Sequence, residues 1–272
     1  MSDNRPIGIF DSGLGGLTVA KEITKLLPNE NIVYFGDTGR VPYGTRSHET
    51  IKKYAAQDER FLLTQGVKMI VAACGTVSSL AGENEKNLPV PFVEVVSHSV
   101  KAAVEATKNK RIGVLATPAT IKSGAHKKQI LEILPDALVI ENSANLLVPL
   151  VEAGWTDSRD IVVKETVRRY VEPMREAQVD TLVLGCTHFP VLAPVISEVL
   201  GEGVTLINMG KSTALAVKEI LAENDALKGD DTVARKQFFV SDKTQTFKET
   251  AAVLLGESAD KLFIEQVDIN KV

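Results

Sequence analysis

The sequence contains few of the residues that would mark a disulfide-rich, metal-binding or membrane-spanning protein. Among its 272 residues are only two cysteines and four histidines, and aromatic residues make up 5%. Two cysteines in a chain of this length cannot form a disulfide framework, and neither residue type shows the spacing of zinc ligands, so no metal is expected. No apolar run approaches the roughly 18 residues that span a bilayer. The polar segment Met1–Pro6 does not resemble a signal peptide, and we expect a cytoplasmic protein.

The overall composition is that of a soluble, folded protein. Apolar residues make up 44% and charged residues 24%, values typical of globular chains. Lysine and arginine together number 31 against 35 aspartate and glutamate residues, which gives a formal charge of −4. This balance argues against a partner that is nucleic acid or an anionic membrane surface. We therefore expect a small-molecule ligand.

Short apolar runs alternate with segments of helical period along the chain. This alternation predicts an α/β fold with mainly parallel sheets flanked by helices, and the abundance of Val, Ile and Leu predicts strands buried on both faces. The expected strands are Ile7–Phe10, Ile32–Phe35, Met69–Ala73, Phe92–Val96, Ile112–Leu115, Leu138–Ile140, Leu182–Leu184, Val204–Ile207 and Phe238–Val240.

A weak internal repeat divides the chain into two related halves. Val67–Cys74 resembles Val179–Cys186 at an offset of 112 residues, and Ile7–Phe10 resembles Ile112–Leu115 at an offset of 105. We expect two pseudo-symmetric α/β domains, the first formed by residues 1–97 plus 212–272 and the second by residues 98–211. Ligands bind beyond the carboxyl ends of parallel strands, which predicts that the two cysteines face one crevice between the domains.

Two turn-rich segments follow predicted strands. Phe10–Gly16 has glycines at the start of a predicted helix, but Thr18 stands where a dinucleotide-binding turn needs its third glycine. A carboxylate site, with Ser12 as a donor, is favoured over a nucleotide site, and an ordinary strand-to-helix turn stays open. The composition of Gly36–Gly44 fits an ordinary surface turn, but its proximity to the turn after the first strand favours a ligand-contacting loop.

The two cysteines are the strongest candidates for chemistry. Each ends a buried strand, and threonine follows within two residues, as Thr76 and Thr187. A lone cysteine in such a place is usually an inert apolar residue. A pair facing each other, at helix starts that lower thiol pKa, fits an acid and a base acting on one carbon. A dithiol redox pair is the less favoured alternative, since no C-x-x-C motif is present.

Five segments in order along the chain resemble the cofactor-independent glutamate racemases of the aspartate/glutamate racemase superfamily. They are Ile9–Gly16, Gly36–Gly44, Cys74–Thr76, Val148–Glu152 and Leu184–Pro190. The resemblance implies two pseudo-symmetric α/β domains with the active site between them. It also implies interconversion of L-glutamate and D-glutamate without a cofactor, which supplies D-glutamate for peptidoglycan and the cell wall.

The same resemblance implies roles for individual residues. Cys74, assisted by Asp11, removes the α-proton of D-glutamate, and Cys186, assisted by His188 with Glu152, removes that of L-glutamate. The residues that match substrate-binding positions, some of them also catalytic, are Asp11, Ser12, Tyr43, Gly44, Gly75, Thr76, Thr117, Thr187 and His188.

The chain also departs from the pattern of the family. Gly75 stands where the family commonly has asparagine, and Ser143–Leu146 differs from the expected Cys-Pro type. Racemisation of aspartate or another amino acid therefore remains an alternative within the superfamily. A catalytically silent protein that binds an acidic amino acid is the alternative from another class. A homodimer is expected from base rates alone.

Overall fold

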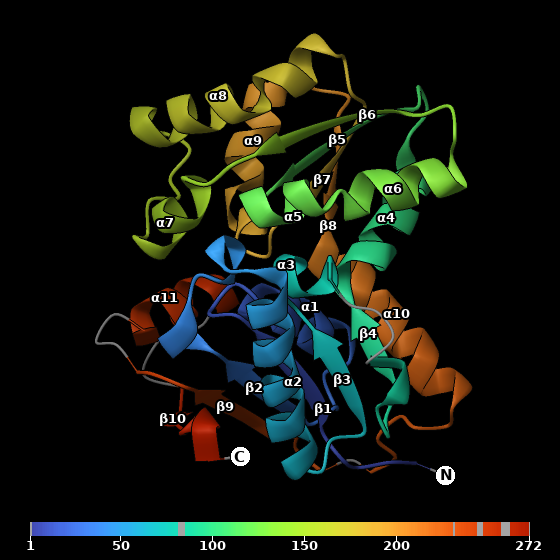
Figure 1. The fold of residues 1–272 in the computed structure, drawn as a ribbon, viewed down its shortest axis with the longest axis vertical. Coiled ribbons are helices and arrows are strands. Elements are labelled where there is room, and N and C mark those ends of the chain that lie inside the picture. Colours follow the sequence, from blue (N-terminus) through green and yellow to red (C-terminus); the bar gives the residue numbers. More distant parts are fainter. Residues whose placement is uncertain (1, 81–84, 231, 244–246, 257–261, 272) are drawn as a thin grey trace.

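The chain forms two parallel β-sheets, one above the other, with helices on both faces of each (Figure 1). This computed structural model describes residues 2–80, 85–230, 232–243, 247–256 and 262–271. The first sheet has the order β10-β9-β2-β1-β3-β4 and the second the order β6-β5-β7-β8. The strands are β1 (Ile7–Asp11), β2 (Ile32–Gly36), β3 (Met69–Ala72), β4 (Phe92–Glu94), β5 (Arg111–Ala116), β6 (Leu138–Ser143), β7 (Thr181–Gly185), β8 (Thr205–Asn208), β9 (Lys236–Val240) and β10 (Ile264–Gln266).

The helices occupy the segments between these strands. The α-helices are α1 (Leu17–Leu26), α2 (His48–Thr64), α3 (Gly75–Ser78), α4 (Val95–Ala106), α5 (Pro118–Ser123), α6 (Ala125–Ile133), α7 (Leu147–Glu152), α8 (Ile161–Glu176), α9 (Ala193–Leu200), α10 (Met209–Glu223) and α11 (Phe247–Leu255). Short 3-10 helices are η1 (Thr38–Arg40), η2 (Tyr43–Thr45), η3 (Glu85–Asn87), η4 (Phe189–Leu192) and η6 (Ile269–Lys271). No helix among the described residues is both long and apolar enough to cross a membrane.

The two sheets repeat one topology. The order β2-β1-β3-β4 in the first corresponds to β6-β5-β7-β8 in the second, and every pairing is parallel. The repeated segments fall on equivalent strands, since Ile7–Phe10 lies in β1 and Ile112–Leu115 in β5. The predicted α/β class with two pseudo-symmetric units is confirmed.

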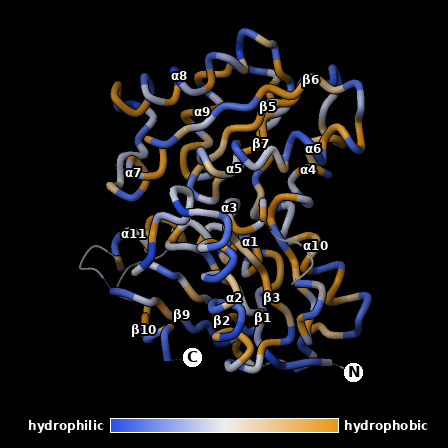
Figure 2. The backbone as a smooth tube through the Cα atoms, viewed as in Figure 1, coloured by the Kyte–Doolittle hydropathy of each residue, from blue (hydrophilic) through white to orange (hydrophobic). Residues whose placement is uncertain are grey.

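Buried apolar side chains fill the space between each sheet and its helices. In the first sheet, Ile7 and Ile9 pack toward α1 and α10, while Phe10 on the opposite face packs toward α2. The strands accordingly form the apolar centre of each layer in Figure 2, and the outer turns are hydrophilic. This two-sided burial fixes the position of the strands whose carboxyl ends carry the loops described below.

Helices α4 and α10 connect the two sheets. Val96 and Val100 of α4 belong to the same buried cluster as strands of the second sheet, while α10 packs against α1. The predicted domain boundaries, after residues 97 and 211, fall inside these two helices. The assignment of residues 1–97 plus 212–272 to one unit and 98–211 to the other remains a prediction, although β9 and β10 do join the first sheet.

Two local differences from the expected elements have simple causes. The strand expected at Phe92–Val96 ends at Glu94, because the Glu94 carboxylate accepts hydrogen bonds from the backbone N–H groups of Val96 and Ser97 and so caps α4. Strand β10 was not expected, since its three residues provide too short an alternation to recognise.

Candidate active site

A pocket of about 360 Å³ lies where the carboxyl ends of the two sheets meet. Its walls are the loops after β1, β2 and β3 of the first sheet and after β5, β6 and β7 of the second. This is the position where parallel sheets bind ligands, and the volume is within the range of small-molecule sites. The residues that line it are Asp11, Ser12, Gly13, Val41, Pro42, Tyr43, Gly44, Thr45, Cys74, Gly75, Thr76, Thr117, Pro118, Thr120, Asn145, Val148, Pro149, Glu152, Gly185, Cys186, Thr187 and His188.

Cys74 stands on one side of the pocket, two residues beyond the end of β3. Its thiol is buried and donates a hydrogen bond to Ser12 Oγ at 3.4 Å. Asp11, also buried, accepts a hydrogen bond from the backbone N–H of Gly13 at 3.0 Å. Burial, reinforced by the negative charge of Asp11, raises the pKa of Cys74 to about 12. Cys74 is therefore a neutral thiol in the unliganded protein.

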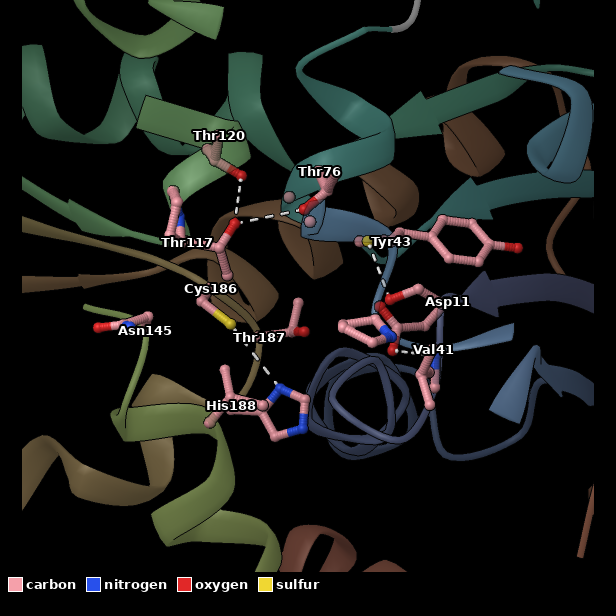
Figure 3. A pocket seen from close by; sticks show the side chains of 18 of the residues that line it. Asp11, Val41, Tyr43, Thr76, Thr117, Thr120, Asn145, Cys186, Thr187 and His188 are labelled. Atoms are coloured by element: carbon pink, nitrogen blue, oxygen red, sulfur yellow. Dashed lines mark hydrogen bonds between the residues drawn. The ribbon is translucent and has the colours of Figure 1, made fainter. Parts of the chain in front are cut away.

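Cys186 lies on the other side, directly after β7, in different surroundings. Its Sγ is 3.7 Å from Nδ1 of His188, and Nε2 of His188 is 3.0 Å from Oε1 of Glu152 at the end of α7. Burial alone lowers the pKa of His188, but the hydrogen bonds to Cys186 and Glu152 outweigh burial and raise it to about 10. A protonated imidazole is therefore expected beside Cys186 at neutral pH. Figure 3 shows the contact between the His188 ring and the Cys186 thiol.

The glycine turn after β1 brings the two halves into contact. A Cβ atom on Gly15 would lie 2.3 Å from Thr187 Oγ1 and 2.5 Å from His188 Nδ1. Thr18 Oγ1, on α1, donates a hydrogen bond to the carbonyl oxygen of Thr187 at 2.7 Å. Gly15 thus permits close packing against the turn that carries Cys186, and Gly13 of the same segment lines the pocket.

Hydroxyl groups from both sheets line a further wall. Thr76 Oγ1 and Thr117 Oγ1 are 3.3 Å apart, and Thr117 Oγ1 is 3.0 Å from Thr120 Oγ1 (Figure 3). The lining among the described residues contains no lysine or arginine. Anionic groups of a ligand would therefore meet hydroxyls, amides, backbone N–H groups and the imidazolium of His188.

Every residue named from the sequence as catalytic or substrate-binding lines this pocket. The hydroxyl of Tyr43 is buried and turned away from Cys186 and His188, so it does not face the ligand space (Figure 3). Gly44 is part of the same wall. Gly75 also lies close to the opposite half, since a Cβ there would be 2.7 Å from the carbonyl oxygen of Gly185.

Sequence reasoning missed several lining residues, among them Asn145 and Thr120. Asn145 could have been found, because it follows the end of β6, where the strand-end rule applies. Thr120 lies inside α5 and carried no comparable signal. Among the described residues no cluster of three or more His, Cys, Asp or Glu side chains is arranged to hold a metal ion.

Comparisons with known proteins agree with this geometry. The family model described as Asp/Glu/Hydantoin racemase matches residues 7–220. A glutamate racemase of Geobacter metallireducens is 42% identical over 268 residues, covering 98% of each chain. The crystal structure of glutamate racemase from Francisella tularensis in complex with D-glutamate has a TM-score of 0.90 and 34% identity, and covers 99% of this chain and 100% of that one. The RacE1 isoform of Bacillus anthracis has a TM-score of 0.90 at 33% identity, with 98% of both chains covered. This chain belongs to the Asp/Glu/Hydantoin racemase family.

Proposed function

We propose that the protein is a glutamate racemase, an isomerase that interconverts L-glutamate and D-glutamate without a cofactor. The observation that carries the proposal is the presence of two cysteines in one small pocket, each at the end of a strand in a different sheet. Inversion at a carbon needs a base on one face and an acid on the other, because a single group would return the proton to the face it left. The similarity to glutamate racemases over nearly the whole chain favours glutamate as the substrate.

The unlike surroundings of the two thiols support a direction for each proton. His188, protonated, stabilises a thiolate at Cys186, which removes the α-proton of L-glutamate. Cys74, a neutral thiol, gives its proton to the opposite face of the resulting carbanion. The product is D-glutamate, with the thiolate now at Cys74 and the thiol at Cys186, and the reverse reaction begins from that state. Asp11 assists Cys74, and Glu152 holds the imidazole of His188 in its orientation.

The α-proton of an amino acid is very weakly acidic, so the pocket must stabilise the carbanion. The donors available are the hydroxyls of Ser12, Thr76, Thr117 and Thr187, together with backbone N–H groups at Gly44 and Gly75. Fixed donors in a site that excludes water stabilise developing charge by several kcal/mol each, on the order of 3 kcal/mol. These residues bind the two carboxylates and the amino group of the substrate.

The test is proton exchange at Cα. The purified protein is incubated in D₂O with L-glutamate or D-glutamate and no added cofactor, and the Cα–H signal is followed by NMR together with optical rotation. Loss of the signal and of optical rotation from both enantiomers is expected. Exchange with L-aspartate but not glutamate would reassign the substrate. Binding measured by calorimetry without any exchange would identify a silent binding protein.

We further propose that the enzyme acts in the cytoplasm as a homodimer and supplies D-glutamate for peptidoglycan. Closed symmetric dimers are the commonest oligomers of soluble proteins. Apolar side chains exposed around α7 and α8, such as Trp155 and Ile161, offer surface for such contact. Analytical ultracentrifugation tests the dimer, and a sedimentation coefficient of the monomer at micromolar concentration would contradict it.

A further inference from the structure

A buried cluster of charged side chains lies behind one wall of the pocket and outside its lining. Asp37 follows β2, Asp58 belongs to α2, and both carboxyl groups are fully buried. The Arg40 guanidinium lies between them, with Nε 2.5 Å from Asp37 Oδ2 and one terminal nitrogen 3.0 Å from Asp58 Oδ1. Its other terminal nitrogen donates to Gln57 Oε1 at 2.5 Å. Two buried acids thus share one partly buried cation.

Tyr43 connects this cluster to the pocket. Its hydroxyl contacts Asp37 Oδ2 and also lies 3.0 Å from Asp58 Oδ2. The ring is buried, and Figure 3 shows the hydroxyl directed away from Cys186 and His188. Residues 41–45 form a continuous part of the pocket lining. The cluster therefore anchors a wall of the site through one phenol group.

The hydrogen atoms of this arrangement can be counted. A phenol has a single proton, so it can donate to only one of the two carboxyl oxygens that it contacts. The other oxygen must itself carry a proton and donate to the phenol oxygen. Otherwise two buried acceptors would face each other with no hydrogen between them, which costs free energy.

The positions of the partners identify which carboxyl group is protonated. The Asp37 oxygen that faces Tyr43, Oδ2, is also the oxygen that accepts from Arg40 Nε at 2.5 Å, and a protonated oxygen is a poor acceptor for a guanidinium. Asp37 Oδ1 is buried and has no hydrogen-bond partner among the described residues, so a proton there would be a donor without an acceptor. Asp58 Oδ2 makes its hydrogen bond with the Tyr43 hydroxyl. The consistent chain runs from Asp58 to Tyr43 to Asp37.

We propose that Asp58 is a neutral carboxylic acid that donates to Tyr43, and that it is a positioning residue holding the wall formed by residues 41–45 against the substrate. One guanidinium then balances one carboxylate, that of Asp37. Burial, followed by the negative charge of Asp37, raises the pKa of Asp58 well above its usual range. Glu59, buried beside it on the same helix, adds to this effect, while Arg40 opposes it. The positioning role rests on the proposed racemase function, whereas the protonation state does not.

The test compares two substitutions of the same kind. In Asp58→Asn, the amide oxygen accepts from Arg40 and the amide N–H donates to Tyr43, as the neutral acid does. We expect kcat and KM within about twofold of the unmodified enzyme. Asp37→Asn removes the anion that Arg40 and Tyr43 both need, and we expect KM for each enantiomer to rise at least tenfold. Asp58→Ala, which lacks the donor, should raise KM several-fold with a smaller change in kcat, and asparagine should rescue it.

Two measurements test the protonation state of Asp58 without an activity assay. Burial also raises the pKa of Glu59 to about 7, so the infrared readout is the difference spectrum between the unmodified protein and Asp58→Asn. At neutral pH this difference should contain a protonated-carboxyl C=O band from Asp58. The stability difference between Asp58→Asn and the unmodified protein should also change with pH. A group whose pKa is raised by folding contributes its full stability below its unfolded pKa of about 4 and loses it as pH rises toward the folded pKa. Asp58→Asn should therefore gain in melting temperature relative to the unmodified protein between pH 4 and pH 8.

Absence of the C=O band from the difference spectrum, or an Asp58→Asn variant as impaired as Asp37→Asn, would overturn the proposal. If the protein showed no exchange with any amino acid, the proposed function would fail while the infrared and pH results still decided the state of Asp58. Calorimetric binding of D-glutamate to the three variants would then replace KM as the test of positioning.

Discussion

The two cysteines differ in the charges around them, and this difference defines the resting state of the site. Cys74 has the carboxyl group of Asp11 as its charged neighbour, and Cys186 has the imidazolium of His188. A proton therefore resides on Cys74 in the unliganded protein, while a positive charge stands beside Cys186. In the proposed scheme, this asymmetry assigns the first proton removal from L-glutamate to Cys186.

Replacing either thiol by a hydroxyl tests the proposed roles of the two cysteines as acid and base. Cys74→Ser and Cys186→Ser should each lower racemisation by roughly 10³-fold or more, because serine is too weakly acidic to replace a thiol as acid or base. Cys74→Ser should still exchange the Cα–H of L-glutamate with D₂O, since Cys186 can return deuterium to the same face. Circular dichroism of both variants controls for folding. Full turnover by either variant would contradict the two-base scheme.

The chemical reactivity of the thiols should reflect the same asymmetry. A small neutral alkylating agent reacts with the thiolate, and the pKa of Cys74 is raised to about 12 by burial and by Asp11. We expect Cys186 to be modified first at pH 7 and Cys74 to become reactive only at strongly alkaline pH. Peptide mass spectrometry after timed alkylation measures both rates, with His188→Ala as the comparison that should slow modification of Cys186. Faster modification of Cys74 at pH 7 would contradict this assignment.

Contacts between elements hold the two halves of the site at a fixed separation. The start of α1 reaches the turn after β7 through the hydrogen bond from Thr18 to the carbonyl oxygen of Thr187. Thr18→Val keeps the shape of the side chain but leaves that buried carbonyl without this donor, which costs about 1–3 kcal/mol of unfolding free energy. Thr18→Ser retains the hydroxyl and should lose much less. Urea unfolding curves of the two variants test the expectation, and equal losses would contradict it.

The tertiary contacts around Gly75 could not be predicted from the sequence. From the sequence we could say that residue 75, next to Cys74, is a glycine where the family commonly has asparagine. The sequence contained no sign that the carbonyl oxygen of Gly185 lies where a Cβ atom at position 75 would be, because that contact joins segments 110 residues apart. The same holds for the cluster behind Tyr43, in which Asp37 and Asp58 meet only after α2 packs on the first sheet. Local patterns locate strand ends, and tertiary contacts decide what surrounds them.

At the scale of the whole molecule, most of the architecture followed from periodicity and from the internal repeat. The expected strands all exist, and the pairing of the two cysteine-bearing segments placed β3 and β7 in equivalent positions. Among the described residues, the one strand that periodicity did not predict is β10. Strand β10 is three residues long and is stabilised by pairing with β9 rather than by its own sequence.

A buried ion pair far from the pocket stabilises the opposite end of the first sheet. The Lys68 ammonium, before β3, is 2.6 Å from Glu30 Oε2 and donates to the carbonyl oxygens of Asp3 and Ala226. Lys68→Met leaves Glu30 as an uncompensated buried charge, and we expect a loss of about 3–5 kcal/mol in unfolding free energy. The double variant with Glu30→Gln should recover part of it. Chemical denaturation measures the unfolding free energy of the single and double variants. As a control, racemisation rates at 25 °C should stay unchanged while the protein is folded. A loss below 1 kcal/mol in Lys68→Met would contradict the expectation.

The order in which strands enter the two sheets has a consequence for synthesis on the ribosome. All four strands of the second sheet lie between residues 111 and 208, whereas β2 in the first sheet pairs on one side with β9, which begins at Lys236. That edge of β2 has no native neighbour until β9, residues 236–240, has been made, and an open strand edge is a template for pairing between chains. The nascent protein therefore exposes this edge of its first sheet while the second sheet is being made, and a stop codon shortly before residue 236 should yield insoluble product.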